Sequence, residues 1–233
     1  MIFFDIDNTL IDHSHAEIKA YENAIMPYLC SNFYENQMKY KLWNSLSEEY
    51  YNKYLRTELT FLEQGTSRVL EFFTRNEISI NKKEAKNLFS LYVQQYTENF
   101  ILFPDVLPVI SKFTSKFPMG IISNGNYSHQ LDKLKKTKIN QYFSCFIISE
   151  EYNFTKPDKE IFDIACQIAR CPNKSCFYIG DNFETDAKGS YAAGLNSIWL
   201  NRRSKGISYD NSIITIEKLT HIDMAIKFKN ICP

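Results

Sequence analysis

The sequence has no excess of charge of either sign. Among its 233 residues, Lys plus Arg and Asp plus Glu each number 27, so the formal net charge is zero. A global field that would attract nucleic acid or an anionic membrane is therefore lacking, and any anion selectivity must be local. We accordingly expect no nucleic acid polymer among the partners.

Long apolar runs are also lacking. No run approaches the length of a transmembrane segment, and the apolar residues 2–6 are expected to form a strand rather than a leader. We therefore expect a cytoplasmic protein with no membrane partner. Apolar residues make up 44% and charged residues 23%, as in ordinary globular proteins, and the length fits one domain with a sizeable insertion, or two domains.

The cysteines contain no C-x-x-C pair, and a chain this long does not need disulfide staples. We expect them to be reduced and mostly buried. Three of them recur every five residues, but this run crosses a helix end at Pro172 and lacks a fourth ligand, which disfavours zinc. The six cysteines are Cys30, Cys145, Cys166, Cys171, Cys176 and Cys232.

Two acids close the first apolar stretch of the chain, at Asp5 and Asp7. A short apolar run followed by turn-forming residues predicts a buried strand of a parallel sheet, and ligands of such sheets bind outside the carboxyl ends of the strands. Carboxylates at i and i+2 share a side of an extended chain, so they repel unless a metal ion or proton lies between them. The alternative is that these acids only end a strand and start a turn.

Amphipathic helices with no convincing strand follow from residue 13 to about 103. Capping boxes are expected at Ser14, Thr60 and Asn81, and residues 34–54 contain neither Gly nor Pro, which favours one helix or a close helix pair. His13 and His15 could be metal ligands, but a carboxylate-rich magnesium site prefers oxygen. We interpret this region as a separate helical lid.

Strands and helices then alternate, which predicts a parallel, doubly wound α/β sheet. Asp105 is the expected N-cap of a helix over 106–117, and a helix is also expected around Met224. The expected strands are 119–122, 145–148, 176–179, 197–200 and 213–216, and the other expected helices are 128–138, 157–169 and 185–193.

Three later strand ends carry polar motifs. Ser123 precedes Asn124 and a glycine turn whose backbone N–H groups can face an anion. Lys156 precedes Pro157, which we place at the first position of a helix. Gly180 allows a tight turn that leads to two further acids, Asp181 and Asp186.

Together these motifs resemble those of the haloacid dehalogenase-like (HAD) hydrolase superfamily. Residues 5–9 match its first motif, Ser123 its second, Lys156 its third, and Asp181 with Asp186 its fourth. The helical insertion is similar to the C1 cap of subfamily I, and residues 180–203 resemble the nucleotidase and sugar-phosphatase branches. The resemblance implies a Rossmann-like core at 1–12 and 104–233, with an all-helical cap at 13–103.

The resemblance also implies a mechanism. Asp5 would be the nucleophile that forms an aspartyl-phosphate, and Asp7 the general acid and base. Mg²⁺ would bind Asp5, the carbonyl of Asp7, Asp181 and Asp186, the last directly or through water. Ser123, the N–H of Asn124 and Lys156 would hold the phosphoryl oxygens.

A magnesium-dependent phosphatase is the activity that the resemblance favours. Its substrate would be a small soluble phosphomonoester, either a nucleoside monophosphate or a sugar phosphate, and the protein would be a monomer or homodimer. Asp7 disfavours dehalogenation, because true dehalogenases lack this second aspartate. A phosphomutase stays open, and so does a non-catalytic binding protein of the same fold, although the intact motif residues speak against the latter.

Specificity is expected to come from the lid. The polar lid residues that we consider as substrate contacts are His15, Arg56, Gln64 and Arg68, with Tyr21 also close to the site entrance. Aromatic side chains near them, Tyr50, Tyr51, Tyr54 and Phe61, either stack on a nucleobase or pack in the core.

Overall fold

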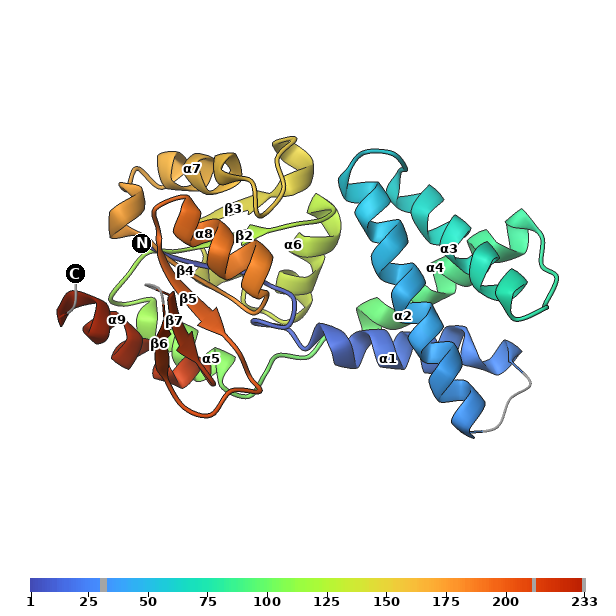
Figure 1. Cartoon of the computed structure of the whole chain (residues 1–233). Helices are drawn as coiled ribbons and strands as arrows, with labels where there is room; N and C mark the ends of the chain where they lie inside the picture. The colour runs from blue at the N-terminus through green and yellow to red at the C-terminus, as the bar shows by residue number, and fades with distance from the viewer. Residues whose placement is uncertain (30–32, 211–212, 232–233) are drawn as a thin grey trace. The chain divides into compact units, whose positions relative to one another are not determined.

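The computed structural model describes residues 1–29, 33–210 and 213–231, which fall into two compact units (Figure 1). One unit consists of Met1–His13 together with Ile101–Pro233, and the other of Ser14–Phe100. Cys30 and Cys232 lie outside the described residues. That the core at 1–12 and 104–233 and the cap at 13–103 are separate domains stays a prediction.

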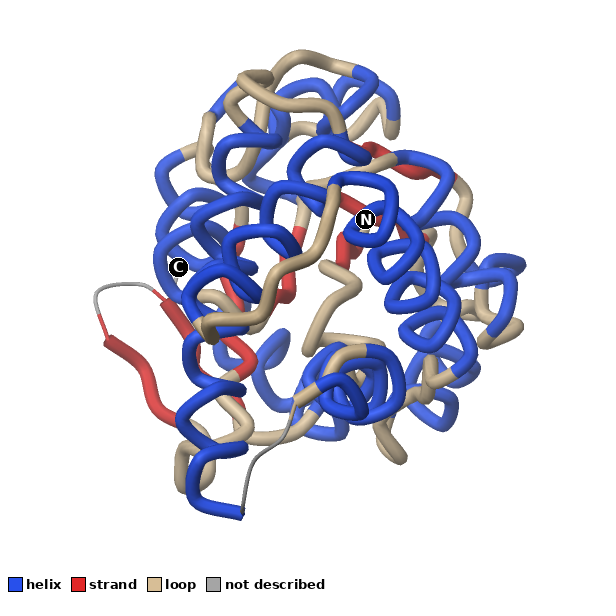
Figure 2. The backbone as a smooth tube through the Cα atoms, turned by 90° about the vertical axis from the view of Figure 1, so that its right-hand side faces the viewer, coloured by secondary structure: helices blue, strands red, loops and turns tan. Residues whose placement is uncertain are grey.

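The first unit is built on a sheet with the strand order β3-β2-β1-β4-β5-β7-β6. All neighbouring strands from β3 to β7 run parallel, which confirms the α/β prediction, whereas β6 pairs antiparallel with β7 at the edge. The strands are drawn in red in Figure 2 and the helices in blue. The strands are β1 (Ile2–Phe4), β2 (Met119–Ser123), β3 (Cys145–Ile148), β4 (Phe177–Gly180), β5 (Asn196–Leu200), β6 (Ser208–Asp210) and β7 (Ile213–Ile216).

Helices of the same unit pack on this sheet. A buried cluster that includes Phe3, Ile122 and Ile147 of the strands and Ile161 and Phe162 of α7 joins sheet and helix. The helices are α5 (Val106–Phe113), α6 (Tyr127–Lys136), α7 (Lys159–Ile168), α8 (Gly189–Ala192) and α9 (Ile222–Ile231), with short 3₁₀ turns at Asn140–Tyr142, Ser149–Glu151, Asn173–Ser175 and Leu219–His221.

Several helix ends differ from the sequence expectation. Asp105 precedes α5 but caps no N–H of that helix, because its carboxylate accepts hydrogen bonds from Arg202 and from the backbone N–H of Leu219. Pro157 is not in the first turn of α7, since that helix begins at Lys159. The expected helix over 185–193 is replaced by a π-helix, η5 (Phe183–Lys188), followed by α8.

The second unit contains helices with an aromatic core (Figure 1). The capping boxes expected at Thr60 and Asn81 are present, whereas Ser14 lies inside the first helix rather than at its N-cap. Residues 34–54 belong to one helix rather than a pair. The elements are α1 (His13–Ala24), a 3₁₀ turn at Met26–Tyr28, α2 (Phe33–Leu55), α3 (Phe61–Arg75) and α4 (Lys82–Glu98).

Aromatic side chains hold α2, α3 and α4 together. The fully buried Trp43 meets Phe72 edge to face at 5.2 Å and Tyr92 at 5.1 Å between ring centroids. Tyr54 and Phe61 meet at 5.9 Å, and Phe61 meets Phe89 at 5.6 Å. These contacts favour core packing over nucleobase stacking for Tyr54 and Phe61.

No helix in the described part of the chain is both long enough and apolar enough to cross a bilayer.

Gly65 of α3 has no side chain, and this allows the Phe89 ring of α4 to pack directly against the α3 backbone. A Cβ at position 65 would overlap the ring of Phe89. Gly65→Ala gains helix propensity, but displacing the buried ring costs more, so we expect a loss of about 1–3 kcal/mol in the free energy of unfolding. Urea denaturation followed by circular dichroism measures it.

The matched control for Gly65→Ala is Ser67→Ala, two residues along the same helix at a half-buried position. This control should change the free energy of unfolding by less than about 0.5 kcal/mol. A Gly65→Ala variant at least as stable as the wild type would contradict the close packing of Phe89 against Gly65.

Candidate active site

Asp5 lies immediately past the end of β1 and is buried. Its backbone N–H donates to the carbonyl of Ile179 on β4 at 2.9 Å, so this residue still follows the sheet. The chain then turns at Asn8, which has a φ of +57°, and the turn is closed by the Asn8 N–H on the Ile11 carbonyl at 2.8 Å. The strand therefore delivers Asp5 to the carboxyl edge of the sheet between β2 and β4.

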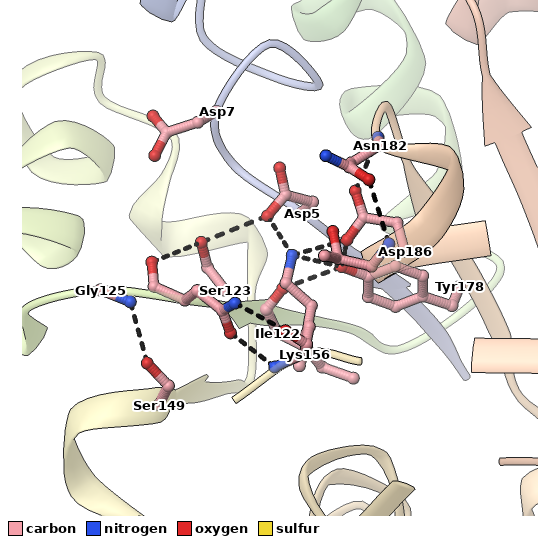
Figure 3. Close-up of polar contacts among 12 residues, drawn as sticks. Asp5, Asp7, Ile122, Ser123, Gly125, Ser149, Lys156, Tyr178, Asn182 and Asp186 are labelled. Carbon is pink, nitrogen blue, oxygen red and sulfur yellow. Dashed lines mark hydrogen bonds and ion pairs between the residues drawn. The ribbon is translucent and has the colours of Figure 1, made fainter. Parts of the chain in front are cut away.

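The ammonium of Lys156 is shared by two carboxylates and a phenol. Its Nζ donates to Asp5 Oδ1 at 2.6 Å, to Asp186 Oδ1 at 2.7 Å and to the Tyr178 hydroxyl at 2.9 Å (Figure 3). Burial acts to lower the pKa of Lys156, but the charges of Asp186 and Asp5 outweigh it and raise that pKa above its usual value. Lys156 is therefore a fixed cation at this edge of the sheet.

Ser123 and Asn124 join the end of β2 to the same group. The Ser123 hydroxyl donates to Asp5 Oδ1 at 3.2 Å. The Asn124 side chain accepts from the backbone N–H of Lys156 at 2.7 Å and donates to the carbonyl of Lys156 at 3.0 Å. Gly125, with a φ of +123°, donates its N–H to the Ser149 hydroxyl at 2.9 Å. The backbone of Lys156 is therefore held by Asn124, and α7 begins only at Lys159.

Asp7 faces a different set of partners. Figure 3 shows its carboxylate turned away from Asp5. Lys133 of α6 donates to both of its oxygens at 2.6 and 2.7 Å, Gln130 donates at 3.1 Å, and His13 Nδ1 lies 3.6 Å away. Burial acts to raise the pKa of Asp7, but the charges of Lys133 and His13 hold that pKa well below its usual range. Asp7 is thus held as a carboxylate.

Asp181 directly follows β4, and Asp186 lies within the π-helix that comes next. Asp186 is buried, and besides Lys156 it accepts from the Tyr178 hydroxyl at 2.8 Å and from the Asn182 N–H at 3.0 Å. Gly180 is required here, because a Cβ at that position would overlap the carboxyl group of Asp186. Tyr178 also contacts the carbonyl of Ile122 at 3.1 Å, which links β4 to β2.

Asp5, Asp181 and Asp186 could together bind a metal ion, and they are the only such group of acids, histidines or cysteines among the described residues. Oxygens of Asp5, Asp181 and Asp186 all lie within 4.8 Å of one another. A set of hard carboxylate oxygens suits Mg²⁺, and the crowding of like charges is what a divalent cation relieves. The side chain of Asp7 is not in this group, and neither is any cysteine or histidine of the described residues.

The electrostatics of the cluster support this fit. Burial raises the pKa of Asp5 to about 6, because Lys156 opposes but does not cancel the effects of burial and of Asp186. Burial, together with the charges of Asp5 and Asp186, raises the pKa of Asp181 to about 8. A carboxylate with so high a pKa has too little positive charge beside it, and a cation would supply that charge.

The structure thus brings most of the residues singled out from the sequence to one sheet edge. Asp5, Ser123 and Lys156 are directly hydrogen-bonded, and Asp181 and Asp186 adjoin Asp5. The lid residues His15, Arg56, Gln64 and Arg68 belong to the other unit. Arg56 forms an exposed ion pair with Glu58 at 2.6 Å, whereas Gln64 and Arg68 are buried.

Three side chains that contact the site residues were not identified from the sequence: Gln130, Lys133 and Tyr178. Lys133 and Gln130 lie three residues apart on α6, so they share a face of the helix that follows Ser123. That spacing, directly after a strand-end motif, was the available indication. Tyr178 lies within the apolar β4 run, where nothing distinguishes an aromatic core residue from one that contacts Lys156.

The sequence is similar to those of known proteins over most of its length. Residues 2–200 match the family model described as haloacid dehalogenase-like hydrolase. The N-acylneuraminate-9-phosphatase of Mus musculus is 25% identical over 209 residues, covering 88% of this chain and 83% of that protein. The pyrimidine 5'-nucleotidase YjjG of Escherichia coli (strain K12) is 27% identical over 201 residues, covering 86% and 85%.

Among solved structures, the fold is similar to that of the HAD-hydrolase YfnB from Bacillus subtilis, determined with bound magnesium. The TM-score is 0.75 at 22% sequence identity, and the match covers 96% of each chain. This likeness concerns the fold of the two proteins.

The raised pKa of Asp181 predicts a stability that depends on pH and on magnesium. A carboxyl group with a pKa of about 8 in the folded state and 3.8 as its ordinary value binds more protons when folded, so stability falls as pH rises between these values. Asp181→Asn removes this loss. We expect the metal-free variant at pH 8 to melt roughly 3–6 °C above the wild type and not to be stabilised by Mg²⁺.

Thermal unfolding at pH 5 and pH 8, with Mg²⁺ and with chelator, measures this. The control is Asp132→Asn, an exposed acid of α6 outside the carboxylate group, which should melt like the wild type. A wild-type protein whose stabilisation by Mg²⁺ does not grow from pH 5 to pH 8 would contradict the assignment of Asp181.

Proposed function

The chain belongs to the haloacid dehalogenase-like hydrolases, and from this premise we propose that it is a magnesium-dependent phosphatase acting on a small phosphomonoester. The observation that carries the proposal is the environment of Asp5, a buried carboxylate in contact with Lys156 and Ser123 beside a cluster of acids. Relatives named as a phosphatase and a nucleotidase, each about a quarter identical, support the same reaction class.

Asp5 is the proposed nucleophile. Its carboxylate oxygen attacks phosphorus, the bond from phosphorus to the leaving oxygen breaks, and an aspartyl-phosphate forms. Water then attacks the same phosphorus, the Asp5–phosphorus bond breaks, and inorganic phosphate leaves. Burial favours this role, because a partly desolvated carboxylate fixed by Lys156 and Ser123 needs little reorganisation before it attacks.

Asp7 is the proposed acid and base. It would donate a proton to the leaving oxygen and then accept one from the attacking water. Lys133 and Gln130 hold Asp7 as a carboxylate, the form suited to the second of these steps. For the first step, Asp7 must leave Lys133 and take up a proton, so the ion pair with Lys133 opposes formation of the aspartyl-phosphate and favours its hydrolysis.

The phosphoryl oxygens are assigned to Ser123, the backbone N–H of Asn124 and Lys156. The Ser123 hydroxyl and Lys156 Nζ donate to Asp5 Oδ1 at 3.2 and 2.6 Å, and the side chain of Asn124 accepts from the backbone N–H of Lys156 at 2.7 Å. Positive charge and N–H dipoles at this place stabilise charge that develops on the transferring group. Because Lys156 is bonded to three acceptors, a phosphoryl oxygen would replace one of them.

Mg²⁺ is the proposed cofactor, held by the carboxylates of Asp5, Asp181 and Asp186 and by the carbonyl of Asp7. Bound there, it would neutralise the charge of the acids and polarise the phosphoryl group. The donor set and the raised pKa values of Asp5 and Asp181 support the assignment. The magnesium-bound structure of the similar HAD-hydrolase YfnB agrees with it.

For the substrate we propose a nucleoside monophosphate or a sugar phosphate, recognised in part by the helical unit. Arg68 and Gln64 are the strongest candidates, since both are buried, and Arg68 Nε and Gln64 Oε1 have no hydrogen-bond partner among the described residues. The Arg68 guanidinium lies 4.5 Å from the ring of Trp43 and 4.9 Å from that of Tyr92. His15 and Arg56 remain further candidate contacts.

Arg68 also forms no ion pair with any described residue. It hydrogen-bonds the Ser47 hydroxyl. Burial lowers the pKa of Arg68, which Tyr92 and Glu17 partly oppose. An arginine that cannot lose its proton and has no ion-pair partner is suited to bind an anionic or strongly polar group of a ligand.

The reaction class is tested by phosphate release from nucleoside monophosphates, sugar phosphates and phosphoglycolate, with Mg²⁺ and with chelator. We expect release that requires Mg²⁺, and a loss of about 10³-fold or more in Asp5→Asn because the nucleophile is gone. Asp132→Asn should behave like the wild type. Phosphate release at the wild-type rate by Asp5→Asn would exclude the covalent route, and no release from any compound would exclude a phosphatase of this substrate class.

The role of Arg68 is tested by Arg68→Met, with Arg68→Lys as the variant that keeps the charge. We expect KM for the best substrate to rise about 10- to 100-fold in Arg68→Met, while kcat/KM for p-nitrophenyl phosphate, which lacks the recognised group, stays unchanged. Because an unpaired buried charge is removed, Tm should not fall. Equal losses with both substrates together with a lower Tm would mean that Arg68 is structural only.

A further inference from the structure

Asp181 is held differently from the other acids of the site. Asp5 contacts Lys156 and Ser123, and Asp186 contacts Lys156, Tyr178 and Asn182. The carboxylate of Asp181 receives no hydrogen bond from any described residue. The direction in which this side chain points must therefore be set by the main chain that carries it.

Trp199 fixes that main chain. It lies on β5 opposite Gly180 of β4, and its indole N–H donates to the carbonyl of Asp181 at 2.7 Å. This hydrogen bond spans 18 residues and joins the sheet directly to the loop that follows β4. Since the donor is on a strand inside the sheet, it offers a rigid reference point for a loop residue.

The Trp199 ring is itself held in place. Phe183 of the π-helix lies against it, with ring centroids 4.7 Å apart, and Lys188 Nζ lies 5.1 Å from the centroid of Phe183. Trp199 therefore contacts the loop twice, through its N–H at Asp181 and through its ring at Phe183. Asn182, which lies between these two residues, caps the π-helix: its side chain accepts hydrogen bonds from the N–H groups of Glu184 and Thr185.

We infer that Trp199 is a positioning residue for the divalent cation, acting through the main chain of Asp181. This inference rests on the proposed function, because the cation is the Mg²⁺ assigned there. Groups that orient metal ligands typically affect metal affinity 10- to 100-fold when they are lost. Without the indole N–H, Asp181 would still be present, but its carboxylate would sample directions that do not face Asp5 and Asp186.

The test is Trp199→Phe, which keeps a ring against Phe183 and removes the N–H. Binding of Mn²⁺, which prefers the same oxygen ligands as Mg²⁺, is followed by electron paramagnetic resonance of the free ion. We expect the Kd for Mn²⁺ to rise about 10-fold, while kcat at saturating metal stays within about twofold of the wild type. The matched control is Trp43→Phe, which removes the other of the two tryptophans, in the helical unit, and should leave the Kd unchanged.

A second variant covers the case in which Trp199→Phe does not fold. Replacing Trp199 by 3-benzothienylalanine, in the Trp43→Phe background, keeps the shape of the indole and exchanges only the N–H for sulfur. The same rise in Kd is expected, with Tm unchanged. A Kd within twofold of the wild type in this variant, or in a folded Trp199→Phe, would overturn the inference. Failure of the wild type to bind Mn²⁺ would instead overturn the proposed cofactor, so the two failures are distinguishable.

Discussion

The compensation of buried negative charge by one ammonium group is the constraint on which this site depends. Asp5 and Asp186 are both buried and close together, and Lys156 lies between them at 2.6 and 2.7 Å. Leaving either acid unpaired in this place would be strongly unfavourable. Two hydrogen bonds between the Asn124 side chain and the backbone of Lys156, and one from Lys156 Nζ to the Tyr178 hydroxyl, keep the ammonium where it pairs with both acids.

That compensation is incomplete, which separates the acids by role. Burial raises the pKa values of Asp5 and Asp181, and one ammonium among three neighbouring carboxylates does not offset this, whereas Asp7, beside its own lysine, keeps a low pKa. A further positive charge placed near Asp5 and Asp181 would therefore stabilise the site. Local instability of this kind is common where a protein binds a cation or an ionic substrate.

The elements that bear the motifs were predictable because each has a strong local cause. The apolar runs before Asp5, Ser123 and Asp181 specify strands, and the capping boxes at Thr60 and Asn81 specify helix starts. Asp105 was misassigned because a distant arginine, Arg202, competes with the local cap, and no local pattern reports that contact. The contacts of Lys133 and Tyr178 depend on which faces of α6 and β4 meet the residues at the end of β1, and the local sequence around either residue does not specify that.

The position of β1 has a consequence for how the chain folds. This strand precedes the helical unit in the sequence, yet its neighbours in the sheet follow that unit: in β2, Met119 pairs with Ile2, and in β4, Phe177 pairs with Ile2. Contacts between segments so distant in sequence form slowly, because the chain loses the entropy of a long loop before the contacts can stabilise it. During synthesis, β1 can pair with β4 only after the whole of Ser14–Phe100, which forms a compact unit of its own, has been made. The edge of the sheet that carries Asp5 can therefore form only after β4 has been synthesised, although Asp5 precedes the whole helical unit in the sequence.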